Sequence, residues 1–299
     1  MRILATHHYP GPAFDELGDV EVRSLGELDA PRPDVEGLVV ANEPVSLDLL
    51  PNLRIVANFG VGYDRVGAEA CLARGVLVTN TPGVLDSSTA DLAFALILAT
   101  RRQVVEGDRL VRSGGWSGSW PEGRLAEEVR GSTLGIVGLG RIGSAVAKRA
   151  RGFDLHVLYT QRHPVDTEIA EFRDLDALLG EADIVTLHVP LTTETSGLID
   201  ARRLSLLRDG TCLVNTARGE VVDERALVAE LVSGRLQAGL DVFVDEPRVP
   251  PELLELPNVV LTPHLGSATR QAREAMTRLV VDNLLAVERG DAPLTPVRL

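Results

Sequence analysis

The sequence predicts an α/β protein built on parallel sheets, and three observations support this prediction. Short, continuously apolar runs rich in Val, Ile and Leu alternate with polar or amphipathic stretches along the 299-residue chain. Runs that are apolar throughout, rather than at every second position, are typical of strands whose sheet is covered on both faces. A glycine-rich turn at residues 138–143 joins one such run to a helical segment, as in a βαβ unit.

The first part of the chain contains four predicted strands. They are residues 2–5, 37–41, 54–59 and 76–79. Residues 64–74 fit a helix between two of these strands, and Gly75 is placed to end it. A further helix, residues 90–100, follows three hydroxyl side chains at 87–89 that can cap its first turn.

A second series of strands begins at Thr133. Its members are residues 134–137, 156–159, 184–189, 212–215, 238–242 and 259–261. Asp174, Asp200 and Asp223 precede helical segments. A carboxylate in that position can accept hydrogen bonds from the free N–H groups of the first turn, so we expect helices to begin there.

The last helix decides the predicted domain organisation. Residues 268–289 carry an apolar stripe at helical spacing, but no strand of the second series follows them. We therefore expect this helix to return to the first domain. The prediction is a discontinuous domain of residues 1–98 and 269–299, with a second domain of residues 99–268 inserted into it.

The composition excludes several classes of protein. The chain has 43 acidic and 30 basic residues and a formal charge of −13, so its field does not favour nucleic acid as a partner. The longest strongly apolar run, residues 92–99, is far shorter than the roughly 20 residues that span a bilayer. Only Cys71 and Cys212 are present, which excludes a disulfide framework. We expect a cytoplasmic protein without nucleic-acid, membrane or metal partners.

The turn at residues 138–143 has the spacing of a dinucleotide-binding loop. Gly138 permits a tight turn, Gly140 lets the backbone approach a pyrophosphate, and Gly143 lets the helix pack on the strand. The helix N-terminus then offers free N–H groups to the anion. The alternative is an ordinary tight turn. The inserted domain is therefore predicted to bind a dinucleotide.

The end of the next strand indicates which dinucleotide is bound. An NAD site usually has Asp or Glu there, to bind the ribose 2′-hydroxyl. This chain has Gln161 and Arg162 instead. A guanidinium pairs with a 2′-phosphate, whereas a carboxylate would repel it. NADP is favoured and NAD stays possible; the alternative is that Arg162 is a solvated loop charge.

Three polar residues follow strand ends in the inserted domain: Arg218, Glu246 and His264. In open α/β sheets this is the edge where ligands bind. A cation can orient and polarise a 2-oxo acid, and an imidazolium can protonate its oxygen as hydride arrives. A carboxylate keeps that imidazolium charged near neutral pH. Each residue alone could be structural, but the three together predict a catalytic site.

These motifs occur in the order found in the D-2-hydroxyacid dehydrogenases, and the chain resembles the glyoxylate/hydroxypyruvate reductase branch of that family. The matching stretches are residues 58–64, 138–143, 158–162, 215–219, 239–243 with 246–247, and 263–269. The resemblance covers essentially the whole chain. It implies two Rossmann- or flavodoxin-like domains with the active site in the cleft, and usually a homodimer.

The resemblance also implies roles for individual residues. Arg218, Glu246 and His264 correspond to the catalytic residues, and the backbone N–H groups of Val61 and Gly62 to a loop that holds the substrate carboxylate. A tryptophan of the family reaches the partner subunit's site. Here it is Trp116 or Trp120, unless both only pack at the dimer arm. The expected cofactor-binding residues are Gly138, Gly140, Arg141, Ile142, Gly143, Gln161, Arg162, Val189, Pro190, Thr195, Thr216, Ala217, Arg218, Asp241, His264 and Gly266.

The function that these expectations imply is NAD(P)H-dependent reduction of glyoxylate or hydroxypyruvate to the D-2-hydroxy acid. Arg218, His264 and Trp116, with the loop at Val61 and Gly62, are the expected substrate-binding residues. Two alternatives stay open. One is a different reaction on the same fold, such as phosphite oxidation or aromatic 2-oxo-acid reduction. The other is a non-catalytic corepressor that senses the dinucleotide.

Overall fold

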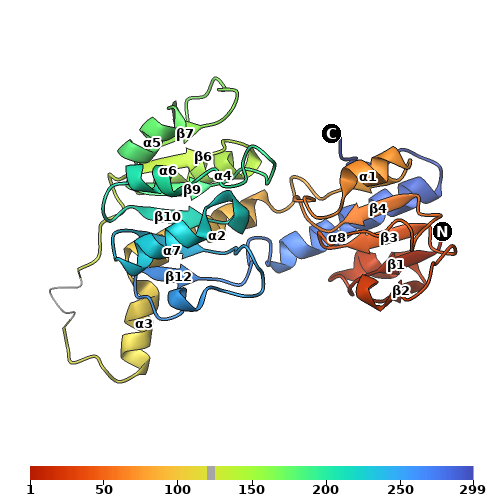
Figure 1. Ribbon diagram of the computed structural model, residues 1–299, viewed down its shortest axis with the longest axis horizontal. Coiled ribbons are helices and arrows are strands. Elements are labelled where there is room, and N and C mark those ends of the chain that lie inside the picture. Colours follow the sequence, from red (N-terminus) through yellow and green to blue (C-terminus); the bar gives the residue numbers. More distant parts are fainter. Residues whose placement is uncertain (120–124, 299) are drawn as a thin grey trace. The chain divides into compact units, whose positions relative to one another are not determined.

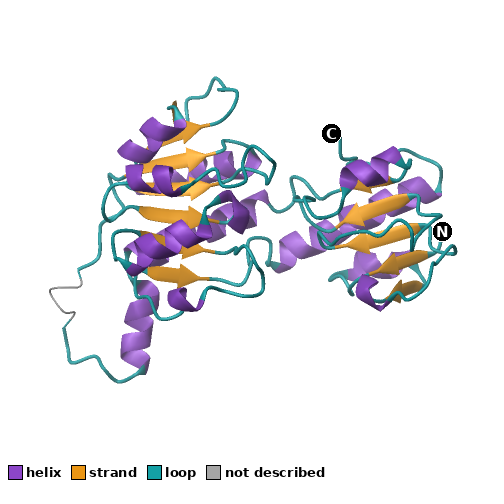
Figure 2. Ribbon diagram, viewed as in Figure 1, coloured by secondary structure: helices purple, strands orange, loops and turns teal. Residues whose placement is uncertain are grey.

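The computed structural model describes residues 1–119 and 125–298, so Trp120 lies outside the described residues. The chain forms two compact units (Figures 1 and 2). Unit 1 consists of Met1–Leu85 and Ser267–Leu299, and unit 2 consists of Asp86–Gly266. Each unit has its own parallel sheet covered by helices, which confirms the predicted α/β class.

Unit 1 has a five-stranded sheet in the order β2-β1-β3-β4-β5. The strands are β1 Ile3–Ala5, β2 Val20–Val22, β3 Gly37–Val40, β4 Ile55–Asn58 and β5 Leu77–Thr79. The sequence did not predict β2, a short strand with Glu21 at its centre and no buried residue. Only Ala68–Ala73 of the expected helix at 64–74 is helical (α1), because Gly67 has a left-handed φ of 74° just before it.

Helix α8, Arg270–Glu288, packs on the sheet of unit 1 and extends from the carboxyl ends of its strands to their amino ends. Its first turn lies near the end of β4, where the Arg273 guanidinium lies over the ring of Phe59, and one turn further the Thr277 hydroxyl donates to the carbonyl of Pro10. Its last turn lies at the strand beginnings, where Glu288 pairs with the N-terminal amino group. The side chain of Leu284 packs against Gly37 at the start of β3. The apolar stripe of this helix therefore covers the sheet of unit 1.

Unit 2 has a seven-stranded parallel sheet in the order β12-β11-β10-β9-β6-β7-β8. Its strands are β6 Thr133–Val137, β7 His156–Thr160, β8 Glu171–Phe172, β9 Ile184–Leu187, β10 Cys212–Asn215, β11 Gln237–Leu240 and β12 Val259–Leu261. Its helices are α2 Asp86–Arg101, α3 Val104–Arg112, α4 Arg141–Ala150, α5 Leu175–Glu181, α6 Ala201–Leu206 and α7 Glu224–Val232. Asp174, Asp200 and Asp223 are the residues that precede α5, α6 and α7.

The sheet of unit 2 is buried on both faces (Figure 2). Ile184 of β9 packs in the cluster that contains α2 and α4, whereas the adjacent Val185 packs with residues of α5 and α7. This explains why the strands are apolar at every position. The expected boundary between residues 98 and 99 falls inside α2. That whole helix belongs to unit 2, because it packs on β10, β11 and α4.

The strand orders place two switch points in the molecule, where neighbouring strands connect in opposite directions. They lie between β6 and β9 in unit 2 and between β1 and β3 in unit 1. Ligands of open α/β sheets bind outside the carboxyl ends of the strands at such points.

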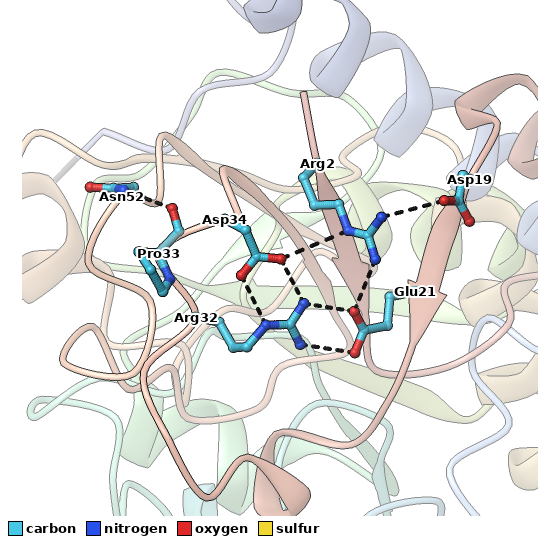
Figure 3. A network of polar contacts seen from close by, with 7 residues as sticks. All are labelled: Arg2, Asp19, Glu21, Arg32, Pro33, Asp34 and Asn52. Atoms are coloured by element: carbon cyan, nitrogen blue, oxygen red, sulfur yellow. Dashed lines mark hydrogen bonds and ion pairs between the residues drawn. The ribbon is translucent and has the colours of Figure 1, made fainter.

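An ion-pair network lies at the opposite, amino edge of the sheet in unit 1 (Figure 3). The Arg32 guanidinium donates to both oxygens of Glu21 at 2.9 and 2.7 Å and to both oxygens of Asp34 at 2.9 and 2.8 Å. Arg2 joins Glu21 and Asp19 at longer distances. The network ties the chain before β1 and β3 to the edge strand β2.

In residues 1–119 and 125–298, no helix is both long and apolar enough to cross a membrane.

Candidate active site

The glycine-rich turn lies between β6 and α4, at the switch point of unit 2. Gly138 has a φ of 96°, and a Cβ there would lie 2.6 Å from the carbonyl oxygen of His188. A Cβ at Gly143 would lie 2.1 Å from the carbonyl oxygen of Gly138. The fold itself therefore requires glycine at these two positions.

Gly140 differs from the other two glycines. A Cβ on Gly140 would meet no protein atom within 4 Å, and its φ of −75° is open to any residue. A side chain would instead fill the open space before the first turn of α4, where backbone N–H groups are free. The turn thus fits the pyrophosphate of a dinucleotide.

Further predicted cofactor residues lie around this turn. Val189 follows β9, and its Cγ1 would lie 2.9 Å from a Cβ on Gly138. The hydroxyl of Thr195 donates to the carbonyl of Pro190 at 2.6 Å, which closes the loop after β9. The hydroxyl of Thr216, just after β10, is buried without a hydrogen-bond partner among the described residues. Its hydrogen-bonding capacity is therefore unused within the described residues.

Gln161 and Arg162 follow β7 at the same edge of the sheet. The Gln161 amide donates to the carbonyl of His163 at 2.5 Å, and Arg162 is exposed. Residues 161–164 contain no carboxylate. The end of β7 therefore presents a positive charge where a 2′-hydroxyl site would have a negative one.

The side chains of His264 and Glu246 form a pair at the ends of β12 and β11. Nδ1 of His264 lies 2.9 Å from Oε2 of Glu246, and Oε1 of Glu246 accepts from the N–H of Phe243 at 3.1 Å. Nε2 of His264 has no hydrogen-bond partner among the described residues. About half of the His264 side chain (48%) is exposed. The imidazole is thus held at one nitrogen and can reach a ligand with the other.

The charge on Glu246 depends on opposing effects. Burial raises the pKa of Glu246, but the hydrogen bond and charge of His264, the N–H of Phe243 and the charge of Arg218 together lower that pKa below its ordinary value. The carboxylate is therefore ionised at neutral pH and can stabilise an imidazolium at His264.

Asp241 holds the backbone that carries His264. Its Oδ1 accepts from the hydroxyl of Thr262 at 2.6 Å and from the N–H of Leu265 at 2.7 Å, and its Oδ2 accepts from the N–H of Gly266 at 2.9 Å. Burial raises the pKa of Asp241, and these three hydrogen bonds oppose that shift. His264 lies within this turn with a φ of 53°. Asp241 therefore fixes the turn from which the imidazole extends.

Arg218 follows β10, and its loop packs closely on the loop after β11. The Asn215 side chain donates to the carbonyl of Arg218 at 2.8 Å and accepts from the N–H of Ala217 at 3.0 Å. A Cβ at Gly219 would lie 2.2 Å from the carbonyl carbon of Phe243, so only glycine allows this approach. The structure thus brings the loops of Arg218, Glu246 and His264 to one edge of one sheet.

In unit 1, the turn after β4 contains Val61 and Gly62, both partly exposed. Among the described residues, the N–H groups of Val61 and Gly62 have no acceptor. The carbonyl of Val61 accepts from the Asn80 side chain at 2.9 Å, and that of Gly62 accepts from Asn58 at 2.9 Å. The turn presents donors without acceptors and is therefore suited to bind an anion.

The structure also shows the surroundings of Trp116 and of three asparagines for which no role was predicted. Trp116 is 58% exposed, and its place in the partner subunit's site stays a prediction. No role was predicted from the sequence for Asn58, Asn80 or Asn215. Asn58 and Asn215 share one signal, a polar residue that ends an otherwise apolar strand. Within the described ranges, no cluster of three or more His, Cys, Asp or Glu side chains could hold a metal ion.

Comparisons with known proteins agree with this geometry. Residues 94–266 match the family model of the D-isomer specific 2-hydroxyacid dehydrogenase NAD binding domain. The chain is 54% identical to the glyoxylate reductase of Pyrococcus horikoshii, over 99% of this chain and 95% of that protein.

Two solved structures are similar over the whole length. A protein from Thermus thermophilus has a TM-score of 0.93 and 44% identity, and all of both chains is covered. The NADPH-dependent glyoxylate/hydroxypyruvate reductase of Sinorhizobium meliloti, in complex with NADP and malonate, has a TM-score of 0.92 and 39% identity. That match covers 99% of this chain and 96% of the other. This chain therefore belongs to the D-isomer specific 2-hydroxyacid dehydrogenase family.

Proposed function

We propose that the protein reduces glyoxylate or hydroxypyruvate to the D-2-hydroxy acid, with NADPH as the preferred cofactor. The observation that carries this proposal is the His264–Glu246 pair beside the loop of Arg218, at the sheet edge that also holds the dinucleotide turn. Similarity to a relative supports it, because the Pyrococcus horikoshii protein, which is 54% identical, is a glyoxylate reductase.

The bound dinucleotide supplies a hydride to the carbonyl carbon. Arg218 binds the substrate carboxylate and polarises the carbonyl with its fixed charge. His264 donates a proton from Nε2 to the carbonyl oxygen, which would otherwise become an alkoxide. Glu246 stabilises the imidazolium before the transfer and orients it through the 2.9 Å contact at Nδ1. Asp241 keeps the turn of His264 in place.

The N–H groups of Val61 and Gly62 supply further donors for the substrate carboxylate in this proposal. Support comes from the lack of any acceptor for them among the described residues. Backbone donors of this kind bind a carboxylate without adding a side chain that would exclude a small substrate.

The preference for NADPH rests on Gln161 and Arg162. The exposed guanidinium of Arg162 suits a 2′-phosphate, and no carboxylate follows β7 to bind a 2′-hydroxyl. The Sinorhizobium meliloti relative is NADPH-dependent and was solved with NADP, which supports the same choice.

The proposed assembly is a homodimer that uses α3 and the segment after it. None of the residues of α3 is buried, and Val104, Val111 and Trp116 are all more than half exposed. Apolar side chains gathered on one exposed segment mark an interaction surface, and a second copy of the chain is the occupant proposed here. Val111→Asp should reduce the molar mass measured by light scattering. Val232→Asp, at an equally exposed position on α7 (56%), should not.

A single assay tests the enzymatic proposal. NADPH oxidation is followed with glyoxylate, hydroxypyruvate and phenylpyruvate, and NADP reduction is followed with phosphite. Turnover of the two small 2-oxo acids, lost in Arg218→Lys because an ammonium cannot replace the two-pronged guanidinium, supports the proposal. Turnover of only phenylpyruvate or phosphite, or of no compound, contradicts it and favours the other enzymes or the corepressor.

A further inference from the structure

The turn after β4 is held by two asparagine side chains. Asn58, the last residue of β4, is fully buried, and its Nδ2 donates to the carbonyls of Gly60 at 3.1 Å and Gly62 at 2.9 Å. Asn80, just after β5, donates from its Nδ2 to the carbonyl of Val61 at 2.9 Å. Three consecutive carbonyl groups of the turn are thus bound by side-chain amides.

These contacts determine where the N–H groups of the turn point. A trans peptide is planar, so its C=O and the N–H of the next residue point in opposite directions. The Asn58 bond to the carbonyl of Gly60 therefore directs the N–H of Val61 away from Asn58. In the same way, the Asn80 bond to the carbonyl of Val61 directs the N–H of Gly62 away from Asn80.

Asn58 also joins this turn to the neighbouring loop. Its Oδ1 accepts at 2.7 Å from the N–H of Asn42, which lies two residues after β3. Asn42 has a φ of 57°, and its own Oδ1 accepts from the N–H of Arg65. Every donor and the acceptor oxygen of the Asn58 amide is in use, so this side chain is fixed between two loops at the carboxyl edge of the sheet.

We infer that Asn58 and Asn80 are positioning residues for the carboxylate of the 2-oxo acid. This inference rests on the proposed function, in which the N–H groups of Val61 and Gly62 bind that carboxylate. The two amides turn the carbonyl oxygens, which would repel an anion, toward the protein and leave the N–H groups for the substrate. Neither asparagine touches the substrate; each acts through the backbone of the turn.

The test uses alanine variants, which add no charge, in the whole chain. Asn58→Ala and Asn80→Ala remove the amide donors without adding a negative charge that would itself repel the substrate. Asn258→Ala is the matched control, because the Asn258 amide also donates to two backbone carbonyls, at 2.9 and 2.8 Å, at the amino edge of unit 2. The measured quantities are kcat and KM for glyoxylate, the Kd of oxalate by calorimetry, and the Kd of NADPH.

We expect Asn58→Ala and Asn80→Ala to raise KM and the oxalate Kd roughly tenfold to a hundredfold, as for the loss of a hydrogen bond to a charged group. The NADPH Kd should not change, and Asn258→Ala should change neither KM nor the oxalate Kd. A purely structural role would lower the active fraction, and so kcat, at constant KM.

An unchanged KM and oxalate Kd in folded Asn80→Ala overturns the inference. Asn80 is only partly buried and makes a single side-chain bond to the turn, so this variant decides the matter even if Asn58→Ala does not fold. If the wild-type enzyme reduces no 2-oxo acid, the proposed function fails. In that case oxalate binding, which needs no turnover, still decides whether the two asparagines position an anion site.

Discussion

Nδ1 of His264 and Oε2 of Glu246 are 2.9 Å apart although 18 residues separate them in the chain. Parallel strands β11 and β12 end side by side, so the loops after them meet. Asp241 holds the first loop to the second through the N–H groups of Leu265 and Gly266. The imidazole is therefore oriented by its carboxylate partner and by the backbone that carries it.

Replacing His264 by Ala should lower kcat for glyoxylate reduction by about 10²- to 10⁴-fold, because the proton donor is lost. The NADPH Kd should stay within a small factor of wild type. Steady-state kinetics and fluorescence titration measure the two quantities. His156→Ala, an exposed histidine at the amino end of β7, is the control and should retain full turnover. Near-normal turnover of His264→Ala would show that another group donates the proton.

Glu246→Gln should lower kcat/KM for glyoxylate and remove the acid limb of its pH profile, because the amide carries no charge at any pH to orient the His264 imidazole. The wild-type profile should keep that limb. Since the folded protein lowers the pKa of Glu246, its carboxylate stays ionised below the ordinary range of a glutamate, and the pair is lost only when the pH falls through that lower value. A variant profile that coincides with that of the wild type would exclude this coupling.

Gly140→Ala should weaken dinucleotide binding at least tenfold without lowering the Tm. The added methyl group meets no protein atom, so the fold tolerates it, but the methyl group occupies the space before α4. Gly180→Ala on α5 also meets no atom within 4 Å and should change neither quantity. Gly143→Ala should lower the Tm strongly, because its Cβ would lie 2.1 Å from a carbonyl oxygen. Full cofactor affinity in Gly140→Ala would place the pyrophosphate elsewhere.

Arg162→Gln should reduce kcat/KM for NADPH at least tenfold and leave kcat/KM for NADH nearly unchanged, because only NADPH carries the 2′-phosphate. Arg130→Gln, which removes an exposed arginine paired with Asp154, is the control for a general loss of positive charge. Equal losses with both cofactors would mean that Arg162 does not recognise the 2′-phosphate.

The network around Arg32 predicts a pH-dependent contribution to stability. Hydrogen bonds from Arg32 lower the pKa of Asp34 from its ordinary 3.8 to about 2, and they also lower the pKa of Glu21. A lowered carboxyl pKa stabilises the fold above the ordinary value, and this stabilisation disappears as the pH falls through the folded value.

The difference in unfolding free energy between wild type and Arg32→Gln should therefore be constant near neutral pH and shrink between pH 4 and about 2. Urea denaturation at a series of pH values measures this difference. Arg74→Gln removes a single exposed contact to Asp48 and should have little effect at any pH. A difference that does not change with pH would mean that Arg32 acts through packing alone.

Local patterns in the chain were sufficient to predict the α/β class, the glycine turn and ten of the twelve strands found in residues 1–119 and 125–298. Continuous apolar runs reflect burial on both faces, and the glycines at 138 and 143 reflect backbone positions that exclude a side chain. Both signals lie within short segments of the chain, so a single sequence is enough to show them. Strands β2 and β8 lack the signal, because they are edge strands with no buried residue.

The tertiary structure decided which groups meet. It used the carboxylate of Asp241 to hold the turn of His264, and it placed Asn58 and Asn80 against the carbonyls of residues 60–62. It also assigned α2 to unit 2. The two partners of each hydrogen bond lie on different strands or loops. The distance between them depends on the order of the strands in the sheet, and no local sequence pattern encodes that order. The residue types were therefore readable from the sequence, whereas their hydrogen-bond partners required the fold.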